Sequence, residues 1–422
     1  MTATGANIRA TIDAVWRIES ARLIGGLARI VRDIGVAEEL AQDAFVAALE
    51  QWPESGIPRN PAAWLMGAAK HRAIDYLRRN KLLERKHEEL GREMDSQRDT
   101  AMEDLDAAVD GDIGDNLLRL IFMTCHPVVS TEARIALTLR LLGGLTTDEI
   151  ARAFLAPEAT IAQRIVRAKR TLAEKRVPFE VPRGAELAER LSSVLEVIYL
   201  IFNEGYTATA GSDWMRPGLC EDALRLGRIL AELTPAEPEV HGVVALMEIQ
   251  ASRSKARSTS AGEPILLLEQ NRALWDGLAI RRGLASLARA EKLGGAGGRY
   301  ALQAAIAACH ARALTAEATD WKRIVALYGE LARVAPSPVV ALNRAVAVAM
   351  AFGPAAGLEL VDALRDEPAL KGYHLLPGVR GDLPFKSGRF NEAREEFVLA
   401  AGLTRNTRER EMMLERAGQC SA

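Results

Sequence analysis

Apolar residues recur every three or four positions through long segments of the chain, which is the period of an amphipathic helix. One clear stripe is formed by Ile161, Ile165, Ala168 and Leu172. Residues 36–52 and 60–79 show the same kind of pattern. Ala and Leu are abundant, whereas aromatic residues and runs of β-branched residues are few, so we predict an all-α protein.

The stretch from Leu145 to Glu174 indicates two helices joined by a very short break. Thr146 and Glu149 have the spacing of a capping box, so the first helix should begin there. Pro157 suits the first turn of the second helix, because its ring fixes a helical φ and its missing N–H is not needed there.

The second of these helices is basic on the face opposite its apolar stripe. Between Thr160 and Arg176 there are six basic residues and one acidic residue. The polar and basic positions are Thr160, Gln163, Arg164, Arg167, Lys169 and Arg170. A helix-turn-helix motif docks in this way, with the start of its second helix at base edges and Lys and Arg on phosphates. The alternative is a helical hairpin whose basic face is only solvated.

Two amphipathic segments with faces of opposite charge precede this motif. Residues 36–52 carry an acidic and amide face formed by Glu38, Glu39, Gln42 and Asp43. A loop rich in Pro and Gly follows, and a second helix begins at an Asn-Pro turn. Its candidate binding residues are Asn60, Lys70, Arg72, Arg78 and Arg79. Asp75 and Arg78 also have the spacing of a local ion pair, which is an alternative to a nucleic-acid role.

Breaks in these patterns divide the chain into four parts. Residues 10–80 form a first helical domain. Residues 81–114 form a linker, because the segment 93–115 holds nine acidic residues against one Arg and has little to bury. Residues 115–176 form the helix-turn-helix domain, which ends before two prolines and a glycine. Residues 187–422 form a larger helical domain.

The last hundred residues show weak repetition. Two aromatic pairs begin at Trp321 and at Phe390, and within each pair the residues are seven apart. The separation between the starts of the two pairs is close to twice a 34-residue period. The segment 388–401 resembles one helix of a tetratricopeptide repeat, with the small residues Ala393 and Ala400 facing a partner helix. Such a period predicts stacked helical hairpins. The alternative is an ordinary α-helical domain.

Composition narrows the functional classes. The 422 residues carry a formal net charge of −2, so any nucleic-acid binding must come from local basic faces. The four cysteines are far apart and no Cys/His cluster has metal-ligand spacing, so we expect no metal and no cofactor. Cys125 beside His126 is expected to pack in the core. We also expect no catalytic residues, no signal peptide, no membrane contact and a cytoplasmic location.

Taken in order, these motifs resemble the extracytoplasmic-function sigma factors of bacterial RNA polymerase, a group of the sigma-70 superfamily. The region-two motif of that family matches Glu39, Gln42, Asp43 and Phe45, and its Trp-Leu signature matches Trp64, Leu65, Asp75 and Arg78. The region-four pattern matches Glu149, Ile150, Ala151, Thr160, Ile161, Arg167, Ala168, Lys169 and Leu172. The resemblance covers about residues 10–176. The segment 198–209 and the repeat-like tail resemble a subgroup with a tetratricopeptide-like C-terminal extension.

The resemblance implies a protein that is not an enzyme and that lends promoter specificity to core RNA polymerase. It assigns Glu39, Gln42, Asp43 and Phe45 to polymerase binding, although we expect Phe45 to pack in the core of the domain. Val36 stands where many relatives have Asp, and Glu38 is expected to substitute for it. It assigns the loop 54–60 and the basic residues of 60–79 to the −10 element, and the basic helix after Thr160 to the −35 element of promoter DNA. The C-terminal domain is expected to dock on the sigma segment, or on a protein partner, and to control access to polymerase or DNA.

Two other readings use the same residues differently. A helix-turn-helix transcription regulator with a helical repeat sensor domain would explain the motif after Leu145. It would not need the acidic helix or the loop and basic helix that follow it. A helical scaffold or enzyme with incidental basic faces is the third reading, and no catalytic dyad at a sensible spacing supports it.

Overall fold

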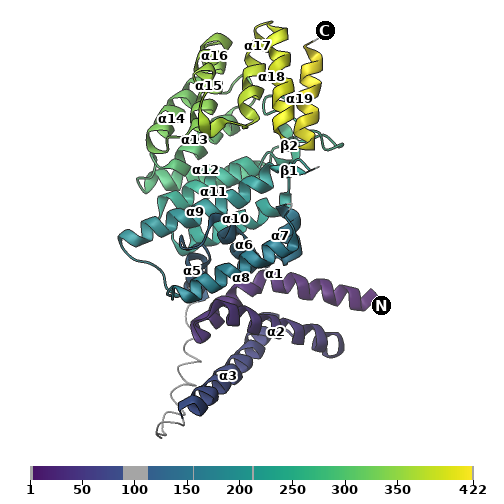
Figure 1. Cartoon of the computed structure of the whole chain (residues 1–422), viewed down its shortest axis with the longest axis vertical. Coiled ribbons are helices and arrows are strands. Elements are labelled where there is room, and N and C mark those ends of the chain that lie inside the picture. Colours follow the sequence, from purple (N-terminus) through teal and green to yellow (C-terminus); the bar gives the residue numbers. More distant parts are fainter. Residues whose placement is uncertain (1–2, 89–112, 155, 212, 421–422) are drawn as a thin grey trace. The chain divides into compact units, whose positions relative to one another are not determined.

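The computed structural model of the chain describes residues 3–88, 113–154, 156–211 and 213–420 (Figure 1). Within these ranges almost all regular structure is helical, which confirms the all-α prediction. The chain divides into two compact units, Met1–Val197 and Ile198–Ala422. None of the described helices is long and apolar enough to cross a membrane.

The first unit contains two groups of helices. The first group is α1 (Ala3–Val31), α2 (Ile34–Ser55) and α3 (Pro61–Glu88). The second group is α5 (Ile113–Thr124), α6 (Thr131–Leu141), α7 (Thr147–Ala153) and α8 (Glu158–Glu174). Helix α3 therefore extends beyond residue 80, where the linker was predicted to begin. The rest of that predicted linker, from residue 89 to residue 112, lies outside the described residues.

Local chemistry sets the ends of the first three helices. Asp33 caps α2 with its carboxylate, which accepts hydrogen bonds from the N–H groups of Gly35 at 2.7 Å and Val36 at 3.0 Å. Helix α2 ends at Gly56, whose φ of 82° is a left-handed conformation that favours glycine. Asn60 caps α3 by accepting a hydrogen bond from the N–H of Ala63 at 3.1 Å.

Small and aromatic side chains pack this first group together. Alanines fully buried at helical spacing on α2 let its neighbours approach closely, and they are Ala37, Ala41, Ala44 and Ala48. Trp52 is 1% exposed and its ring meets Trp64 edge-on at 5.4 Å. Phe45 packs on Trp16 with ring centroids 4.7 Å apart, as expected for a residue that contributes to the domain core.

The helix-turn-helix prediction agrees with the local geometry of α7 and α8. Glu149 accepts a hydrogen bond from the N–H of Thr146 at 2.8 Å, and the Thr146 hydroxyl accepts one from the N–H of Glu149 at 3.1 Å. This is the predicted capping box. The buried residues of α8 are Ile161, Ile165, Ala168 and Leu172, which are the four positions of the predicted apolar stripe.

Helix α9 (Ala185–Tyr206) begins in the first unit, where its side chains form hydrogen bonds with residues of α5 and α6 and of the turn between them. Arg190 donates a hydrogen bond to the backbone oxygen of Phe122 at 3.0 Å. Ser193 donates one to the backbone oxygen of Cys125 at 2.6 Å and accepts one from Arg134. A truncation at residue 187 would therefore remove part of the packing of the helix-turn-helix domain. The segment 177–184 before α9 has no helix, as its prolines predicted.

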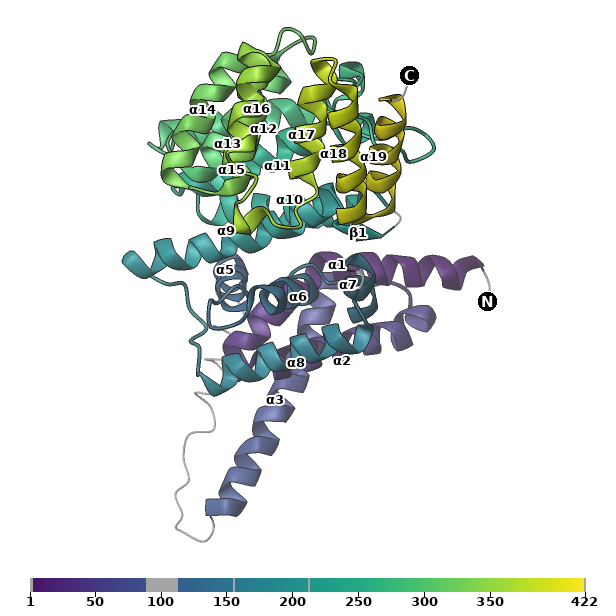
Figure 2. The same cartoon turned by 45° about the horizontal axis from the view of Figure 1, so that its top comes forward.

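The second unit consists of helices that lie side by side in chain order (Figure 2). Its α-helices are α10 (Pro217–Leu233), α11 (Pro238–Ala251), α12 (Gly277–Lys292), α13 (Arg299–Arg312), α14 (Trp321–Val334), α15 (Pro338–Phe352), α16 (Pro354–Asp362), α17 (Leu375–Lys386), α18 (Phe390–Leu403) and α19 (Thr407–Gln419). Three short 3-10 helices are η1 (Ser254–Ala256), η2 (Arg272–Leu274) and η3 (Pro368–Leu370). Contacts mainly between sequence neighbours are typical of stacked hairpins. Ala393 and Ala400 are fully buried, as the sequence predicted.

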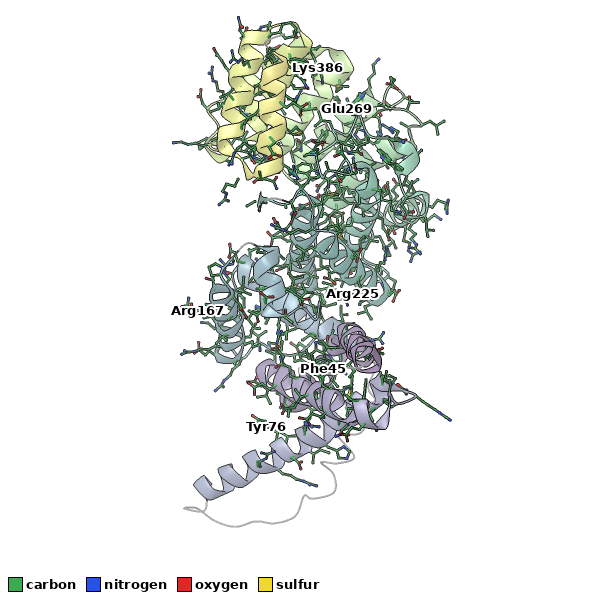
Figure 3. All side chains as sticks on the ribbon, turned by 90° about the vertical axis from the view of Figure 1, so that its right-hand side faces the viewer. Phe45, Tyr76, Arg167, Arg225, Glu269 and Lys386 are labelled. Carbon is green, nitrogen blue, oxygen red and sulfur yellow. The ribbon has the colours of Figure 1, made fainter. Side chains whose placement is uncertain are left out.

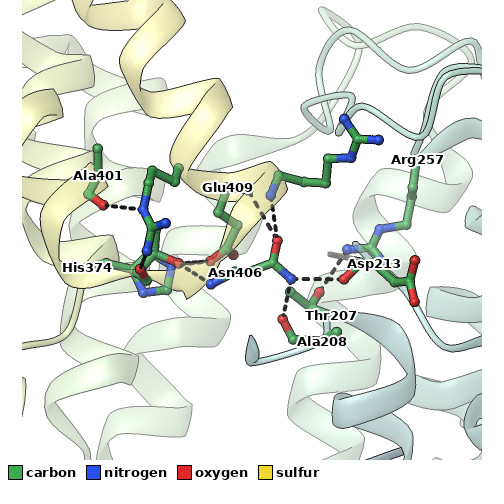
Figure 4. A network of polar contacts seen from close by, with 11 residues as sticks. Thr207, Ala208, Asp213, Arg257, His374, Ala401, Asn406 and Glu409 are labelled. Atoms are coloured by element: carbon green, nitrogen blue, oxygen red, sulfur yellow. Dashed lines mark hydrogen bonds and ion pairs between the residues drawn. The ribbon is translucent and has the colours of Figure 1, made fainter. Parts of the chain in front are cut away.

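The two ends of the second unit meet at a pair of two-residue strands. Strand β1 (Ala210–Gly211) pairs in parallel with β2 (Arg405–Asn406), nearly two hundred residues later. Asn406 is 0% exposed, and its amide donates to the backbone oxygens of Ala208 at 3.0 Å and Asp213 at 2.9 Å (Figure 4). Its carbonyl oxygen caps α19 by accepting from the N–H groups of Arg408 and Glu409. One buried side chain thus ties the last hairpin to the loop after α9.

We expect Asn406→Ala to loosen this junction. The substitution removes an N-cap, which destabilises the helix by about 1 kcal/mol. It also leaves two backbone oxygens without a donor, which costs about a further 1–3 kcal/mol. The free energy of local opening should fall by about 2–4 kcal/mol. Hydrogen exchange of the full chain, read by mass spectrometry, should show lost protection at residues 205–213 and in α19. Asn271→Ala, which removes one exposed cap bond to Ala273, is the matched control. Unchanged exchange at 205–213 would contradict this assignment.

Candidate protein and nucleic-acid interfaces

Only some of the residues predicted for the acidic face of α2 are exposed to solvent. Glu39 and Asp43 are exposed and stand one helical turn apart, and Gln42 is half-buried. Glu50 is also exposed, and its spacing of seven residues from Asp43 places it on the same face. The sequence analysis did not predict Glu50, although its heptad spacing from Asp43 identifies it. These carboxylates can form charge-assisted hydrogen bonds with arginines of a protein partner.

Glu38 does not share this exposed face, which corrects the prediction made from the sequence. Its side chain is 5% exposed, and it accepts a hydrogen bond from Arg140 of α6 at 2.7 Å and forms an ion pair with Lys169 of α8. It also accepts a hydrogen bond from Gln42 at 2.7 Å. A buried carboxylate needs such partners because desolvation of an unpaired charge is costly. The side chain therefore turns toward the cations of the helix-turn-helix group and away from solvent.

A pocket of about 470 Å³ opens between α1 and the start of α3. Its polar lining is Glu19, Arg22, Asn60 and Lys70, and its apolar lining includes Leu23 and Met66. Glu19 forms a 3.4 Å ion pair with Arg22. Asn60 is the last residue of the Pro- and Gly-rich loop, so loop and pocket adjoin. A pocket of this size and mixed lining can hold a flat polar ligand such as a nucleobase.

The basic face of α3 continues away from this pocket. Lys70 lies at the pocket, and Arg72 is half-buried with its guanidinium donating to the backbone oxygen of Ala68 at 3.1 Å. Arg78 and Arg79 are exposed. Among the described residues no ion pair joins Asp75 and Arg78, so the structure does not support the local alternative for Arg78. Exposed guanidinium groups along one helix face suit phosphate contacts.

Helix α8 presents most of its predicted polar face to solvent. Gln163, Arg167 and Arg170 are exposed, and Arg167 points away from the domain (Figure 3). Thr160 and Arg164 are half-buried near the start of the helix. Arg170 also forms a 2.6 Å ion pair with Glu174, one turn later. Lys169 differs from these residues, because its ammonium group is paired with Glu38.

Val166 is a further candidate on α8 that the sequence analysis did not single out. Its side chain is 62% exposed between Gln163 and Arg170, on the face opposite the buried stripe. An exposed apolar side chain among basic residues suits contact with the methyl group of thymine in the major groove. The sequence could have indicated this exposure, because Val166 lies outside the apolar stripe of the helix.

The cysteines and histidines in the described part of the chain do not indicate a metal site or a reactive thiol. No group of His, Cys, Asp and Glu there could hold a metal ion. Cys125 is 1% exposed and 3.4 Å from the Thr138 hydroxyl, and burial raises the pKa of its thiol. A buried thiol with a raised pKa is an inert packing group, in line with the sequence interpretation.

Comparison with known families assigns three segments of the chain. Residues 18–82 match Sigma-70 region 2, and residues 119–172 match Sigma-70 region 4. Residues 190–291 match a family of unknown function (DUF6596). The first two matches coincide with the helices that carry the acidic face, the pocket and the helix-turn-helix motif.

Two known proteins show significant sequence similarity to the chain. An uncharacterized protein of Rhizobium meliloti (strain 1021) is 43% identical over 387 residues, which are 92% of this chain and 90% of that protein. The ECF RNA polymerase sigma factor SigK of Mycobacterium ulcerans (strain Agy99) is 30% identical over 158 residues, which are 36% of this chain and 78% of that protein. No solved structure shows significant similarity to the chain.

Proposed function

Because this chain belongs to the ECF sigma factors of bacterial RNA polymerase, we propose that α2 binds core polymerase while α3 and α8 bind separate promoter elements. The observation that carries the proposal is the charge of the exposed faces. Glu39 and Asp43 make α2 acidic, whereas Arg167 and Arg170 make α8 basic. A helix-turn-helix regulator with a sensor domain is not favoured, because it leaves the match of residues 18–82 to Sigma-70 region 2 without a role.

For the −10 element, we assign capture of an unstacked base to the pocket between α1 and α3. Asn60 and Lys70 line it, and the exposed Arg78 and Arg79 continue the positive face along α3. Arg72 adds positive charge on the same helix. Removal of a base from the stack costs a few kcal/mol, which a pocket with polar contacts at its mouth can offset.

For the −35 element, we assign base or groove contacts to Thr160, Gln163 and Arg164 near the start of α8. Arg167, Lys169 and Arg170 are assigned to phosphates. This division follows helix-turn-helix docking, in which base contacts specify sequence and phosphate contacts fix position. Catalysis belongs to the polymerase in this proposal, and the protein works in the cytoplasm with it.

We predict different outcomes for two exposed residues of α8. Gln163→Ala should change the preference among −35 sequences. The side-chain amide can form hydrogen bonds to a base edge, and these bonds discriminate against the wrong base by about 1–3 kcal/mol. Arg167→Ala should weaken all promoters about equally and reduce the salt dependence of binding by about one unit of slope. Run-off transcription by reconstituted polymerase, over a −35 library and a salt series, tests both. Equal effects from the two substitutions would contradict the assignment, and failure of the wild type to direct initiation would refute the proposed function.

We further propose that the second unit regulates the sigma segment, either by docking on it or by binding a protein partner. The start of α9 supports a coupling, because its buried residues, among them Leu191 and Val194, pack in the first unit. A substitution within the second unit is a cleaner test than deletion of residues 187–422. Deletion would also unpack α5 and α6, so lost transcription would not distinguish regulation from misfolding.

A further inference from the structure

Three arginines gather around aromatic rings in the segment between α11 and α12. The guanidinium carbon of Arg253 lies 5.7 Å from the ring centre of Tyr206 and 5.8 Å from that of Trp275. Arg257 lies 3.5 Å from the ring centre of Tyr206, and Arg272 lies 4.8 Å from that of Trp275. The shared rings place the three cations in one neighbourhood.

Two of these arginines are held by neutral partners. Arg257 is 6% exposed and donates to the backbone oxygen of Tyr206 and to the Thr207 hydroxyl at 2.9 Å. Arg272 donates to the backbone oxygens of His310 at 2.5 Å and Ala313 at 2.7 Å, at the end of α13. None of these acceptors is a carboxylate. The Glu317 carboxylate acts on Arg272 from further away and opposes the effect of burial on its pKa.

The guanidinium of Arg253 has fewer hydrogen-bond partners than those of Arg257 and Arg272. It is 9% exposed, and its buried Nε has no hydrogen-bond partner within the described residues. No ion pair to Arg253 is found among those residues either. Stacking on two rings contributes only about 1–2 kcal/mol. A buried guanidinium without an anion normally costs several kcal/mol, which makes an unpaired one a marker of a binding site.

Two more buried groups in the same place lack partners. The indole N–H of Trp275, which is 8% exposed, has no acceptor in the described part of the chain. Nδ1 of His310 is also unpartnered there. Burial, and then the positive charges of Arg253 and Arg272, lower the pKa of His310 to about 4. Burial also lowers the pKa of both Arg257 and Arg272.

We propose that this cluster, defined by Arg253, Arg257, Arg272 and Trp275, binds the oxyanion group of a small ligand, either a phosphate or a carboxylate. The planar guanidinium of Arg253 is the primary contact, since its paired N–H groups match both anions in two-point hydrogen bonds. The indole N–H of Trp275 is the second donor. The site lies wholly within the second unit, and its binding does not rest on the sigma function proposed above.

Binding of inorganic phosphate and of succinate to the full-length protein tests the proposal. Calorimetry and tryptophan fluorescence should detect saturable binding at constant ionic strength, with sodium chloride as the reference. Arg253→Met should weaken binding by about 10- to 100-fold, the factor expected for lost hydrogen bonds to a charged group. Arg282→Met removes an exposed arginine of α12 and should leave binding unchanged. A response to phosphate alone or to succinate alone identifies the anion class, and a response to neither overturns the proposal.

Stability measurements separate a receptor from a structural arginine. Without anion, Arg253→Met should melt at the same temperature as the wild type or higher, because it replaces an unpaired buried charge with an apolar chain of similar length. The anion should raise the melting temperature of the wild type but not of the variant. A variant that melts lower without anion, together with a wild type insensitive to anion, would show a structural role.

A second substitution, Trp275→Phe, tests anion binding independently if Arg253→Met fails to fold. Trp275→Phe retains an aromatic ring for Arg253 and removes only the N–H donor. It should fold normally and weaken anion binding by about 3- to 10-fold, as expected for one neutral hydrogen bond. Full anion affinity in a folded Trp275→Phe protein would exclude the indole as a contact.

Discussion

The double variant Glu39→Gln/Asp43→Asn is expected to lose nearly all binding to core RNA polymerase. Both carboxylates are exposed on one face of α2, so no contact within the described fold depends on them. Each charge-assisted hydrogen bond to a partner arginine contributes a factor of about 10 to 100 in affinity. Loss of both should weaken polymerase binding by about 100- to 10,000-fold and remove promoter-specific transcription.

This result is measured by titration of labelled protein with core polymerase and by run-off transcription. Glu180→Gln is the control, because Glu180 is an exposed acid in the segment between α8 and α9, away from α2. Circular dichroism should show that both proteins are folded alike, since exposed substitutions rarely change stability by more than about 0.5 kcal/mol. Wild-type polymerase affinity in the double variant would remove α2 as the interface.

The substitution Glu38→Gln is expected to separate the two helical groups of the first unit and to release α8 for DNA. Glu38 joins α2 to Arg140 of α6 and to Lys169 of α8. Removal of the buried charge leaves two cations facing each other, which destabilises the contact by about 3–5 kcal/mol. Polymerase contact by Glu38 and phosphate contact by Lys169 each require this ion pair to break, so the paired state opposes both.

We therefore expect Glu38→Gln to raise the affinity of the free protein for duplex −35 DNA by about 10-fold or more at low salt, because one phosphate-binding cation is released. Fluorescence anisotropy without polymerase measures this. The double variant Glu38→Gln/Lys169→Gln should lose the gain, since it lacks the released cation. If Glu38→Gln binds DNA as weakly as the wild type, the ion pair does not restrain α8.

Features that depend on neighbours in sequence were predictable. The capping box of Thr146 and Glu149 and the buried stripe of α8 follow from hydrogen bonds and periodicity within one or two helical turns. The order of an acidic helix, a loop and two basic helices likewise determined which faces are candidates for polymerase and DNA.

Partners distant in sequence were decided by tertiary structure alone. Glu38 pairs with cations 102 and 131 residues away, and Asn406 bonds the loop after α9 across nearly two hundred residues. Arg253 lies in a segment whose polar residues indicate a solvated loop, yet it is buried and its guanidinium lies within 6 Å of two ring centres. A sequence pattern specifies which residues share one side of a helix. Which charge is buried, and against what, depends on how separate helices pack, because desolvation and pairing arise only when distant segments meet.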